Sequence, residues 1–194
     1  MVPRVVDHDE RRMELTRAAM ALVRDEGLAA LSVRGLAAAS GWSPGAVRHY
    51  LPTHQSMVDA VVEGVRSGFE ARLLAVEPQP DPLEHARALL RAALPLDDES
   101  RELSRVWFAF LGSRAHLADG AGLIAYDELA GLLQDMFAGF QRVERLRSTT
   151  PRGAAVTLQA TLDGLTIHLL MERVDADEAI AALDRALDQL VDRP

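Results

Sequence analysis

The sequence predicts an all-α protein of about nine helices, in which a short domain at residues 1–54 precedes a longer one at 55–194. Apolar residues recur every three or four positions through most of the 194 residues, which is the period of an amphipathic helix. No segment alternates apolar and polar residues over the length of a useful strand. Three prolines between positions 78 and 82 interrupt the helical pattern, because proline cannot occupy a helix interior.

Two helices are predicted before residue 40. The first begins near Asp9 and ends at Gly27, a residue type that commonly terminates helices. Its inward face is an apolar stripe at helical spacing: Leu15, Ala19, Leu22 and Val23. Ser32, a preferred N-cap, begins a second helix that runs to about Ala39. Its inward positions are Val33, Leu36 and Ala37.

A third helix is predicted after a turn at residues 40–42. Ser43 serves as its N-cap, and Pro44 takes the first helical position, where a missing N–H costs nothing. The helix ends near Tyr50, because Pro52 disfavours a helical conformation at Leu51.

The remaining helices belong to the longer domain. Thr53 caps a fourth helix at 55–77 that connects the two domains, with Met57, Val61, Val65, Phe69 and Leu73 recurring every four residues. Further helices are expected at about 82–94, 98–116, 122–146, 152–172 and 175–192.

Charge is distributed unevenly along the chain. The net charge of −8 argues at first against a nucleic-acid partner. Residues 1–51, however, hold seven Arg and six acidic residues, which gives +1 and leaves −9 for the remainder. From Gly27 to Met57 there is no acidic residue, so Arg34 and Arg48 have no acidic neighbour in sequence. This local asymmetry suits contact with phosphate groups.

Residues 32–51 have the features of a helix-turn-helix. Ala37, Ala38 and Ala39 allow two helices to cross closely, and Gly41 suits the turn between them. The third helix starts with small residues, so its first turn could lie against base edges in a major groove. That slim start comprises Ser43, Pro44, Gly45 and Ala46. The alternative is a three-helix packing motif in which Arg48 and His49 are ordinary surface groups.

Residues Leu31–Met57 resemble the DNA-binding signature of the tetracycline-repressor (TetR) family. Residues Leu94–Leu111 are similar to the ligand domains of betaine-regulator-like members. The resemblance implies an all-helical homodimer that binds a double-stranded DNA operator. Its last two long helices would pair with those of the second copy, and a small-molecule inducer would bind in the C-terminal ligand-binding and dimerisation domain.

The same resemblance implies roles for individual residues. Ser32 and Arg34 should touch phosphate or a base edge, and Ser43, Gly45, Ala46 and His49 should lie along the groove. The DNA backbone should be met by Arg48, Tyr50, Thr53 and His54. At His54 the family commonly has Lys, and histidine is mostly neutral near pH 7, so the sequence does not settle whether His54 replaces the usual phosphate contact.

One motif and the histidine content bear on whether the protein is an enzyme. Gly41-Trp-Ser-Pro-Gly45 matches the G-x-S-x-G nucleophile elbow of serine hydrolases, with Ser43 as nucleophile. That motif works only where a strand turns into a helix, whereas here an alanine-rich helix precedes it. The six His residues lack metal-ligand spacing, and the absence of cysteine excludes thiolate sites and disulfides. We therefore expect neither an enzyme nor a metal or other cofactor.

In the longer domain, aromatic residues gather on two predicted helices. They either form core or line an apolar effector pocket with a few polar anchors. Aromatic residues beside acidic ones could suit a cationic ligand. The pocket candidates are Trp107, Phe108, Leu111, Arg114, Tyr126, Leu133, Phe137, Phe140, Thr161 and His168. Asp163 is a further possible anchor; alternatively, Asp163 and His168 cap or bridge at the dimer seam.

Leucine-rich stripes at spacings of three and four predict a helix-to-helix seam between two copies. The predicted dimer interface consists of Leu162, Leu165, Leu169, Ile180, Leu183, Leu187 and Leu190. No apolar run is long enough to span a bilayer and no signal peptide is evident, so a cytoplasmic location is expected. We expect a ligand-responsive, dimeric transcription regulator that represses until an inducer releases it. The alternative is a helical small-molecule binder or hydrolase.

Overall fold

The computed structural model describes residues 8–112, 121–147 and 149–192. These residues form nine α-helices, one 3₁₀-helix and a single isolated β-bridge, between Leu146 and Val191. The all-α prediction is confirmed. The chain divides into two compact units, Met1–Gly68 with Arg105–Gly122 and Phe69–Ser104 with Leu123–Pro194. The first division falls inside helix α4, whereas the sequence placed the domain boundary before it.

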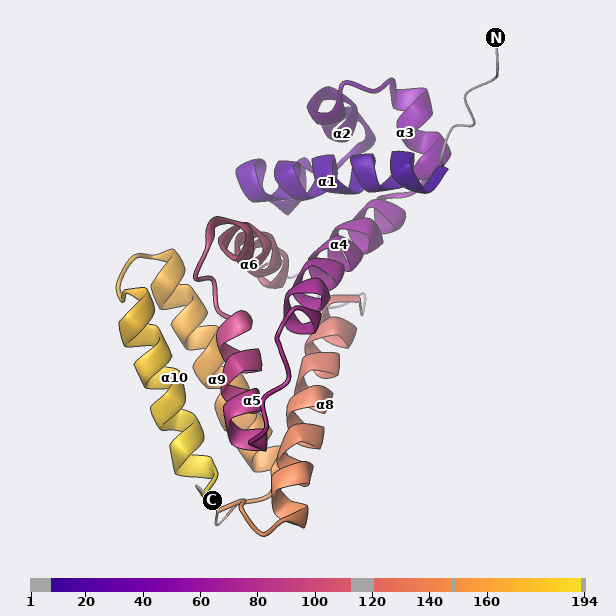
Figure 1. Cartoon of the computed structure of the whole chain (residues 1–194). Helices are drawn as coiled ribbons and strands as arrows, with labels where there is room; N and C mark the ends of the chain where they lie inside the picture. The colour runs from indigo at the N-terminus through magenta and orange to yellow at the C-terminus, as the bar shows by residue number, and fades with distance from the viewer. Residues whose placement is uncertain (1–7, 113–120, 148, 193–194) are drawn as a thin grey trace. The chain divides into compact units, whose positions relative to one another are not determined.

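Unit 1 contains the amino-terminal helices (Figure 1). These are α1 (His8–Glu26), η1 (Leu28–Ala30), α2 (Val33–Ser40), α3 (Pro44–Tyr50) and most of α4 (His54–Leu74). Asp9 lies in the first turn of α1 rather than before it, where its negative charge suits the exposed N–H groups of a helix start. Gly27 has φ +81° and ends α1 as predicted. The predicted stripe of α1 is fully buried: Leu15, Ala19, Leu22 and Val23.

Helices α1 and α4 pack closely at Gly64. A Cβ atom on Gly64 would lie 2.5 Å from the sulfur of Met20 and 2.9 Å from Cγ2 of Thr16. Glycine therefore allows an approach of the two helices that a larger residue would obstruct. Met57, Val61 and Val65 of α4 are also buried. The apolar stripe predicted at every fourth position is therefore part of the core of unit 1 over this length.

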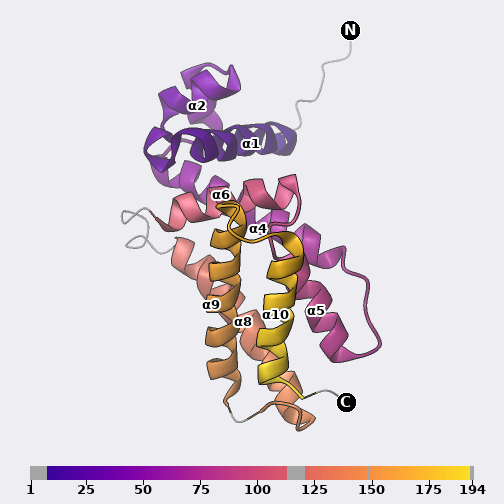
Figure 2. The same cartoon turned by 90° about the vertical axis from the view of Figure 1, so that its left-hand side faces the viewer.

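Unit 2 is built from α5 (Pro82–Ala92), the first half of α6 (Asp98–Leu111), most of α8 (Ala121–Arg142), α9 (Pro151–Leu170) and α10 (Ala176–Leu190). Helices α9 and α10 lie side by side and antiparallel, as Figure 2 shows. Asp81 caps α5, Thr150 caps α9, and Asp175 with Glu178 forms a complete capping box on α10. Phe137, Leu158 and Leu187 are among the fully buried side chains of the unit's core.

Four helices of unit 2 end earlier than the sequence predicts. Helix α8 stops at Arg142 instead of about 146, and α5, α9 and α10 each stop two residues early, at Ala92, Leu170 and Leu190. Helices α8 and α9 share a further feature at this end. Soon after each end, Glu144 and Glu172 adopt φ of +56° and +55°. Glycine is the residue that usually adopts this left-handed conformation after a helix. Because glutamate occupies these positions, the sequence did not indicate that the helices end here.

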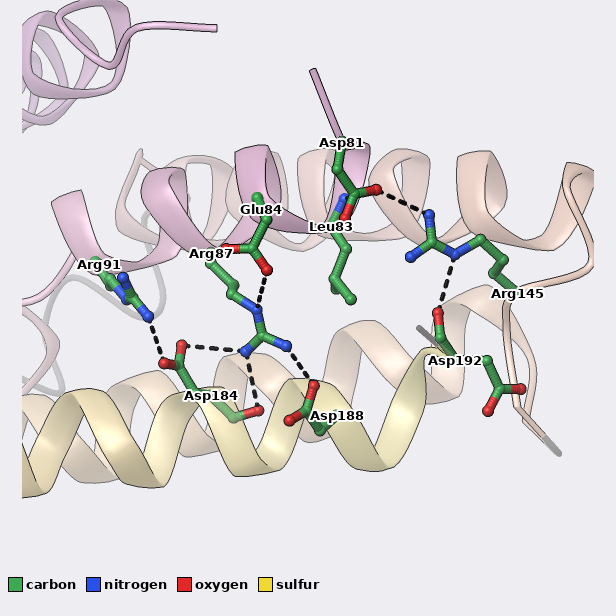
Figure 3. A network of polar contacts seen from close by, with 9 residues as sticks. All are labelled: Asp81, Leu83, Glu84, Arg87, Arg91, Arg145, Asp184, Asp188 and Asp192. Atoms are coloured by element: carbon green, nitrogen blue, oxygen red, sulfur yellow. Dashed lines mark hydrogen bonds and ion pairs between the residues drawn. The ribbon is translucent and has the colours of Figure 1, made fainter. Parts of the chain in front are cut away.

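A polar network holds α5 against α10 (Figure 3). Arg87 is only 6% exposed, and its guanidinium contacts Glu84 at 3.1 Å, Asp184 at 3.4 Å and also Asp188. Arg91 forms a further ion pair with Asp184. Burial alone would lower the pKa of Arg87, but Asp188 and Asp184 outweigh that effect and raise it.

Candidate nucleic-acid interface

The helix-turn-helix forms where it was predicted. The Ser32 side chain accepts a hydrogen bond from the Gly35 N–H at 3.0 Å and caps α2. Gly41 ends α2 with φ +73°, a left-handed conformation that glycine adopts without strain. The Ser43 side chain accepts from the Ala46 N–H at 3.2 Å and caps α3. Both serine hydroxyls can still donate a hydrogen bond outward.

The close approach in this motif occurs at a residue that the sequence reasoning missed. A Cβ on Gly35 would lie 2.4 Å from the carbonyl oxygen of Ala30, so only glycine fits there. Of the three alanines assigned to the crossing, Ala37 is buried, whereas Ala38 and Ala39 are exposed. The glycine three residues after the Ser32 N-cap was the signal in the sequence that could have identified this close approach.

The residues predicted to meet DNA lie at the surface of unit 1. Ala46 and Tyr50 are half-buried, and the others are exposed: Ser32, Arg34, Ser43, Pro44, Gly45, Arg48, His49, Thr53 and His54. Arg34 and Arg48 pair with no carboxylate among the described residues, so their charge is not neutralised there. A Cβ on Gly45 would meet nothing closer than the Ser43 hydroxyl oxygen at 3.9 Å. The start of α3 is therefore slim and open.

Thr53 is engaged in capping α4. Its hydroxyl oxygen accepts from the Ser56 N–H at 2.9 Å, while the Ser56 hydroxyl oxygen accepts from the Thr53 N–H at 3.0 Å. This reciprocal pair satisfies two N–H groups that would otherwise lack partners at the helix start. The Thr53 N–H is thus already used within the chain, while its hydroxyl proton stays available as a donor.

The G-x-S-x-G match does not form a nucleophile elbow. Gly41 follows helix α2, Ser43 accepts its bond from Ala46 as an N-cap, and no strand occurs in the described part of the chain. The strand-turn-helix geometry that exposes a hydrolase serine is missing from this segment. Within the described residues, no three His, Asp or Glu side chains come together as a metal site requires. No described helix is long and apolar enough to cross a membrane.

The pocket candidates fall in several environments. Trp107, Phe108 and Leu111 are half-buried in unit 1, and Arg114 lies outside the described residues. Three others are core residues of unit 2, because their side chains are packed among buried apolar neighbours: Leu133, Phe137 and Phe140. His168 is exposed, and the Thr161 hydroxyl donates to the Thr157 carbonyl oxygen of its own helix.

Tyr126 and Asp163 form a half-buried polar pair between α8 and α9. The Tyr126 hydroxyl donates to Asp163 Oδ2 at 2.5 Å, and the buried Gln159 amide donates to the Tyr126 carbonyl oxygen at 3.3 Å. Burial raises the pKa of Asp163, although the Tyr126 hydrogen bond opposes the shift. Burial, with Asp163 nearby, raises the pKa of Tyr126 to about 12. No cationic side chain of the described residues pairs with Asp163.

The predicted dimer interface needs correction, because most of its leucines face inward. Four of them are in the core of the single chain: Leu162, Leu169, Leu183 and Leu187. The other three are partly buried against that core: Leu165, Ile180 and Leu190. The exposed apolar side chains of this segment lie on the other face of α9, Val156 at 60% and Ile167 at 41%, and at its C-cap, Met171 at 59%.

The α5–α10 network was also missed. Its arginines are four residues apart on α5 and its aspartates four residues apart on α10, so each pair shares one helix face. This matched spacing is visible in the sequence. However, no local sequence feature indicates that residues about a hundred positions apart come into contact.

Known proteins share both the sequence pattern and the fold of this chain. The sequence family described as BetI-type transcriptional repressor, C-terminal, matches residues 82–192, more than half of the chain. The transcriptional regulator BetI 2 of Chromohalobacter salexigens is 28% identical over 196 residues, covering 98% of this chain and 93% of the relative.

Two solved structures have the same fold. A TetR-family regulator from Rhodococcus sp. aligns with a TM-score of 0.84 at 20% identity, over 94% of this chain and 99% of that one. A transcriptional regulator from Saccharomonospora viridis, in complex with choline, aligns with a TM-score of 0.79 at 19% identity, over 95% of this chain and 100% of that one. The chain therefore belongs to the TetR family of transcriptional regulators, and its carboxyl-terminal part is of the BetI type.

Proposed function

We propose that this regulator is a homodimeric, cytoplasmic repressor that binds a near-palindromic operator through α3 and is released by a small-molecule inducer. The observation that carries the DNA-binding part is the exposed start of α3, which Ser43 caps and where Gly45 leaves room for a base edge. Arg34 and Arg48 supply charge for the flanking phosphates. The protein has no catalytic role in this proposal.

Titration of the DNA upstream of its own gene, at several salt concentrations, tests this function. Phosphate contacts predict an affinity that falls steeply with salt, with a log–log slope of about −0.9 per contact. Arg48→Ala should weaken operator and random DNA equally and make the slope shallower by about one contact. Arg142→Ala, an exposed arginine at the end of α8, is the matched control and should change neither. Absence of a sequence-selective complex at low salt would contradict the proposal.

The second copy would pair through the exposed face of α9. Val156, Ala160, Gly164, Ile167 and Met171 follow one another at spacings of three and four, which aligns them along one side of the helix. Beyond the Cβ position of Gly164 there is open space, so small residues at the centre would let a partner helix approach closely. A contiguous apolar stripe on a surface is typical of a protein interface.

The inducer would bind in unit 2, with Asp163 as its polar anchor. A half-buried carboxylate beside a tyrosine ring, without a cationic partner among the described residues, suits a positively charged effector. The related S. viridis regulator was crystallised with choline, which supports a quaternary ammonium as the first probe.

Calorimetric titration with choline and with its neutral carbon isostere 3,3-dimethylbutan-1-ol tests the anchor. Choline should bind and release DNA, whereas the neutral isostere should bind more weakly. Asp163→Asn should abolish that preference, while Asp135→Asn, an exposed carboxylate on α8, should preserve it. Equal binding of both molecules by the wild type would contradict the assignment.

A further inference from the structure

The recognition helix of unit 1 has little apolar packing of its own. Helix α3 spans seven residues, Pro44–Tyr50, and Val47 is its only buried side chain. Such a short helix is not stable by itself, so contacts at its two ends must fix its orientation. Leu51, which is fully buried, anchors the carboxyl-terminal end. The amino-terminal end follows directly after Trp42.

Trp42 contacts two side chains of α1, Glu14 and Arg11, which also contact each other. Its indole N–H donates to Glu14 Oε1 at 3.2 Å. The second oxygen of Glu14 lies 3.1 Å from Nη1 of Arg11. The Arg11 guanidinium in turn lies over the Trp42 ring, 5.4 Å from its centroid. Each of the three side chains therefore contacts the other two.

The indole also touches α3 directly. Its edge meets the Tyr50 ring with a centroid distance of 5.6 Å and an interplanar angle of 76°, a favourable edge-to-face geometry. Tyr50 has a similar contact with His49, at 5.0 Å and 88°. One residue after Trp42, Ser43 caps α3. A displacement of the indole would therefore shift both the first turn of α3 and the ring of Tyr50.

We infer that Glu14, supported by Arg11, positions the recognition helix through Trp42 and so determines how well the protein distinguishes its operator from other DNA. Glu14 is a positioning residue: it carries a negative charge, which suits phosphate poorly, and acts through the indole. The inference rests on the proposed binding of DNA by α3. Base-edge contacts require α3 in one orientation, whereas phosphate contacts tolerate small shifts. Loss of the positioning contact should therefore reduce selectivity more than it reduces total DNA affinity.

The pair Glu14→Ala and Glu14→Gln isolates the hydrogen bond. Both variants remove the negative charge, but the glutamine oxygen can still accept from the Trp42 N–H. Operator and random-DNA affinities of the full-length protein would be measured for each variant, together with thermal unfolding. Glu26→Ala, which removes another exposed carboxylate of α1, is the matched control.

Glu14→Ala should lower the ratio of operator to random-DNA affinity by about tenfold, the scale of one charge-assisted hydrogen bond. Glu14→Gln should restore most of that ratio, and Glu26→Ala should leave it unchanged. In a Trp107→Phe background, where Trp42 is the only tryptophan, the indole emission should change in Glu14→Ala and return toward the wild-type spectrum in Glu14→Gln.

Equal selectivity of Glu14→Ala and the wild type, or equal losses in the alanine and glutamine variants, would overturn the inference. A wild-type protein without any preference for an operator would instead overturn the proposed function, and this inference with it. The wild-type titration therefore separates the two failures.

Discussion

Gly45, at the second position of α3, is a position where DNA binding can be tested without disturbing the fold. It is exposed, its backbone does not need a positive φ, and an added Cβ would meet no atom of the chain within 3.9 Å. The protein itself therefore tolerates a side chain here. Any large effect of a substitution on DNA binding must then come from the DNA side of the interface.

Gly45→Asp should abolish operator binding while leaving the thermal midpoint within a few degrees of the wild type. The carboxylate would occupy the space into which a base edge fits, and the neighbouring phosphates would repel it. Gly45→Ala is the control for the fold, and alanine should slightly stabilise α3, by less than about 1 kcal/mol. Unchanged operator affinity in Gly45→Asp, by gel shift or anisotropy, would exclude this face of α3 from the interface.

Asp163 predicts a pH dependence of stability. Its folded pKa is raised above the ordinary value of 3.8, so the folded state binds the proton more tightly than the unfolded state does. Stability is therefore lost as the pH rises from about that value through the raised pKa. Asp163→Asn stays neutral and keeps an acceptor for Tyr126, so its melting temperature relative to wild type should increase between pH 4 and pH 7.

The control for that titration is Asp135→Asn, on the exposed side of α8. Its difference from wild type should vary less over the same pH range. A constant melting difference for Asp163→Asn would show that folding does not shift the pKa of Asp163, and one that shrinks toward pH 7 would show that the folded protein stabilises the carboxylate. Either result would contradict the prediction.

At the scale of elements, the contact between α5 and α10 depends on a charge that is removed from water. Arg87→Ala would leave Asp184 and Asp188 without their shared cation, and we expect it to destabilise the protein by about 1.5–3 kcal/mol, the scale of a hydrogen bond to a charged group. Arg185→Ala, an exposed arginine on α10, should change the free energy of unfolding by less than about 0.5 kcal/mol. Chemical denaturation measures the free energy of unfolding of both variants. If Arg87→Ala is as stable as Arg185→Ala, apolar packing alone holds α5 in place.

Helix starts were predictable from the sequence because their signals are local. Ser32 and Ser43 each cap a helix through bonds to an N–H three residues later. Helix ends were less predictable where Glu144 and Glu172 take a left-handed conformation that tertiary structure must impose. The matched spacing of Arg87 with Asp184 was readable only after the fold had brought α5 and α10 together.

The same limit explains why residues predicted for the dimer interface lie in the core of the single chain. The leucine stripe of α10 correctly marks a helix-to-helix seam, but periodicity does not say which helix lies across it. In this chain α5 and α9 are the partners in the core, so Leu183 and Leu187 are buried within one copy. The helices and caps of the helix-turn-helix were predictable because they are encoded within one short stretch of sequence.

At the scale of the whole molecule, the exposed stripe of α9 predicts the oligomeric state. Replacing Ile167 and Met171 together with Glu should convert a dimer into a monomer, because both side chains are exposed in the single chain and would be buried against a second copy. Light scattering coupled to gel filtration reports the mass. Val143→Glu, at an exposed valine just after the end of α8, should remain dimeric. A dimeric double variant would place the interface elsewhere.

A hydroxyl-radical footprint of the full-length protein on its operator tests the central claim most directly. A dimer reading DNA through two copies of α3 predicts two protected half-sites on one face of the duplex, roughly 34–36 Å apart or a multiple of that distance. Both should weaken together as salt is raised, and both should disappear with Gly45→Asp. A single protected patch, or protection that does not depend on sequence, would contradict a dimeric operator-binding regulator.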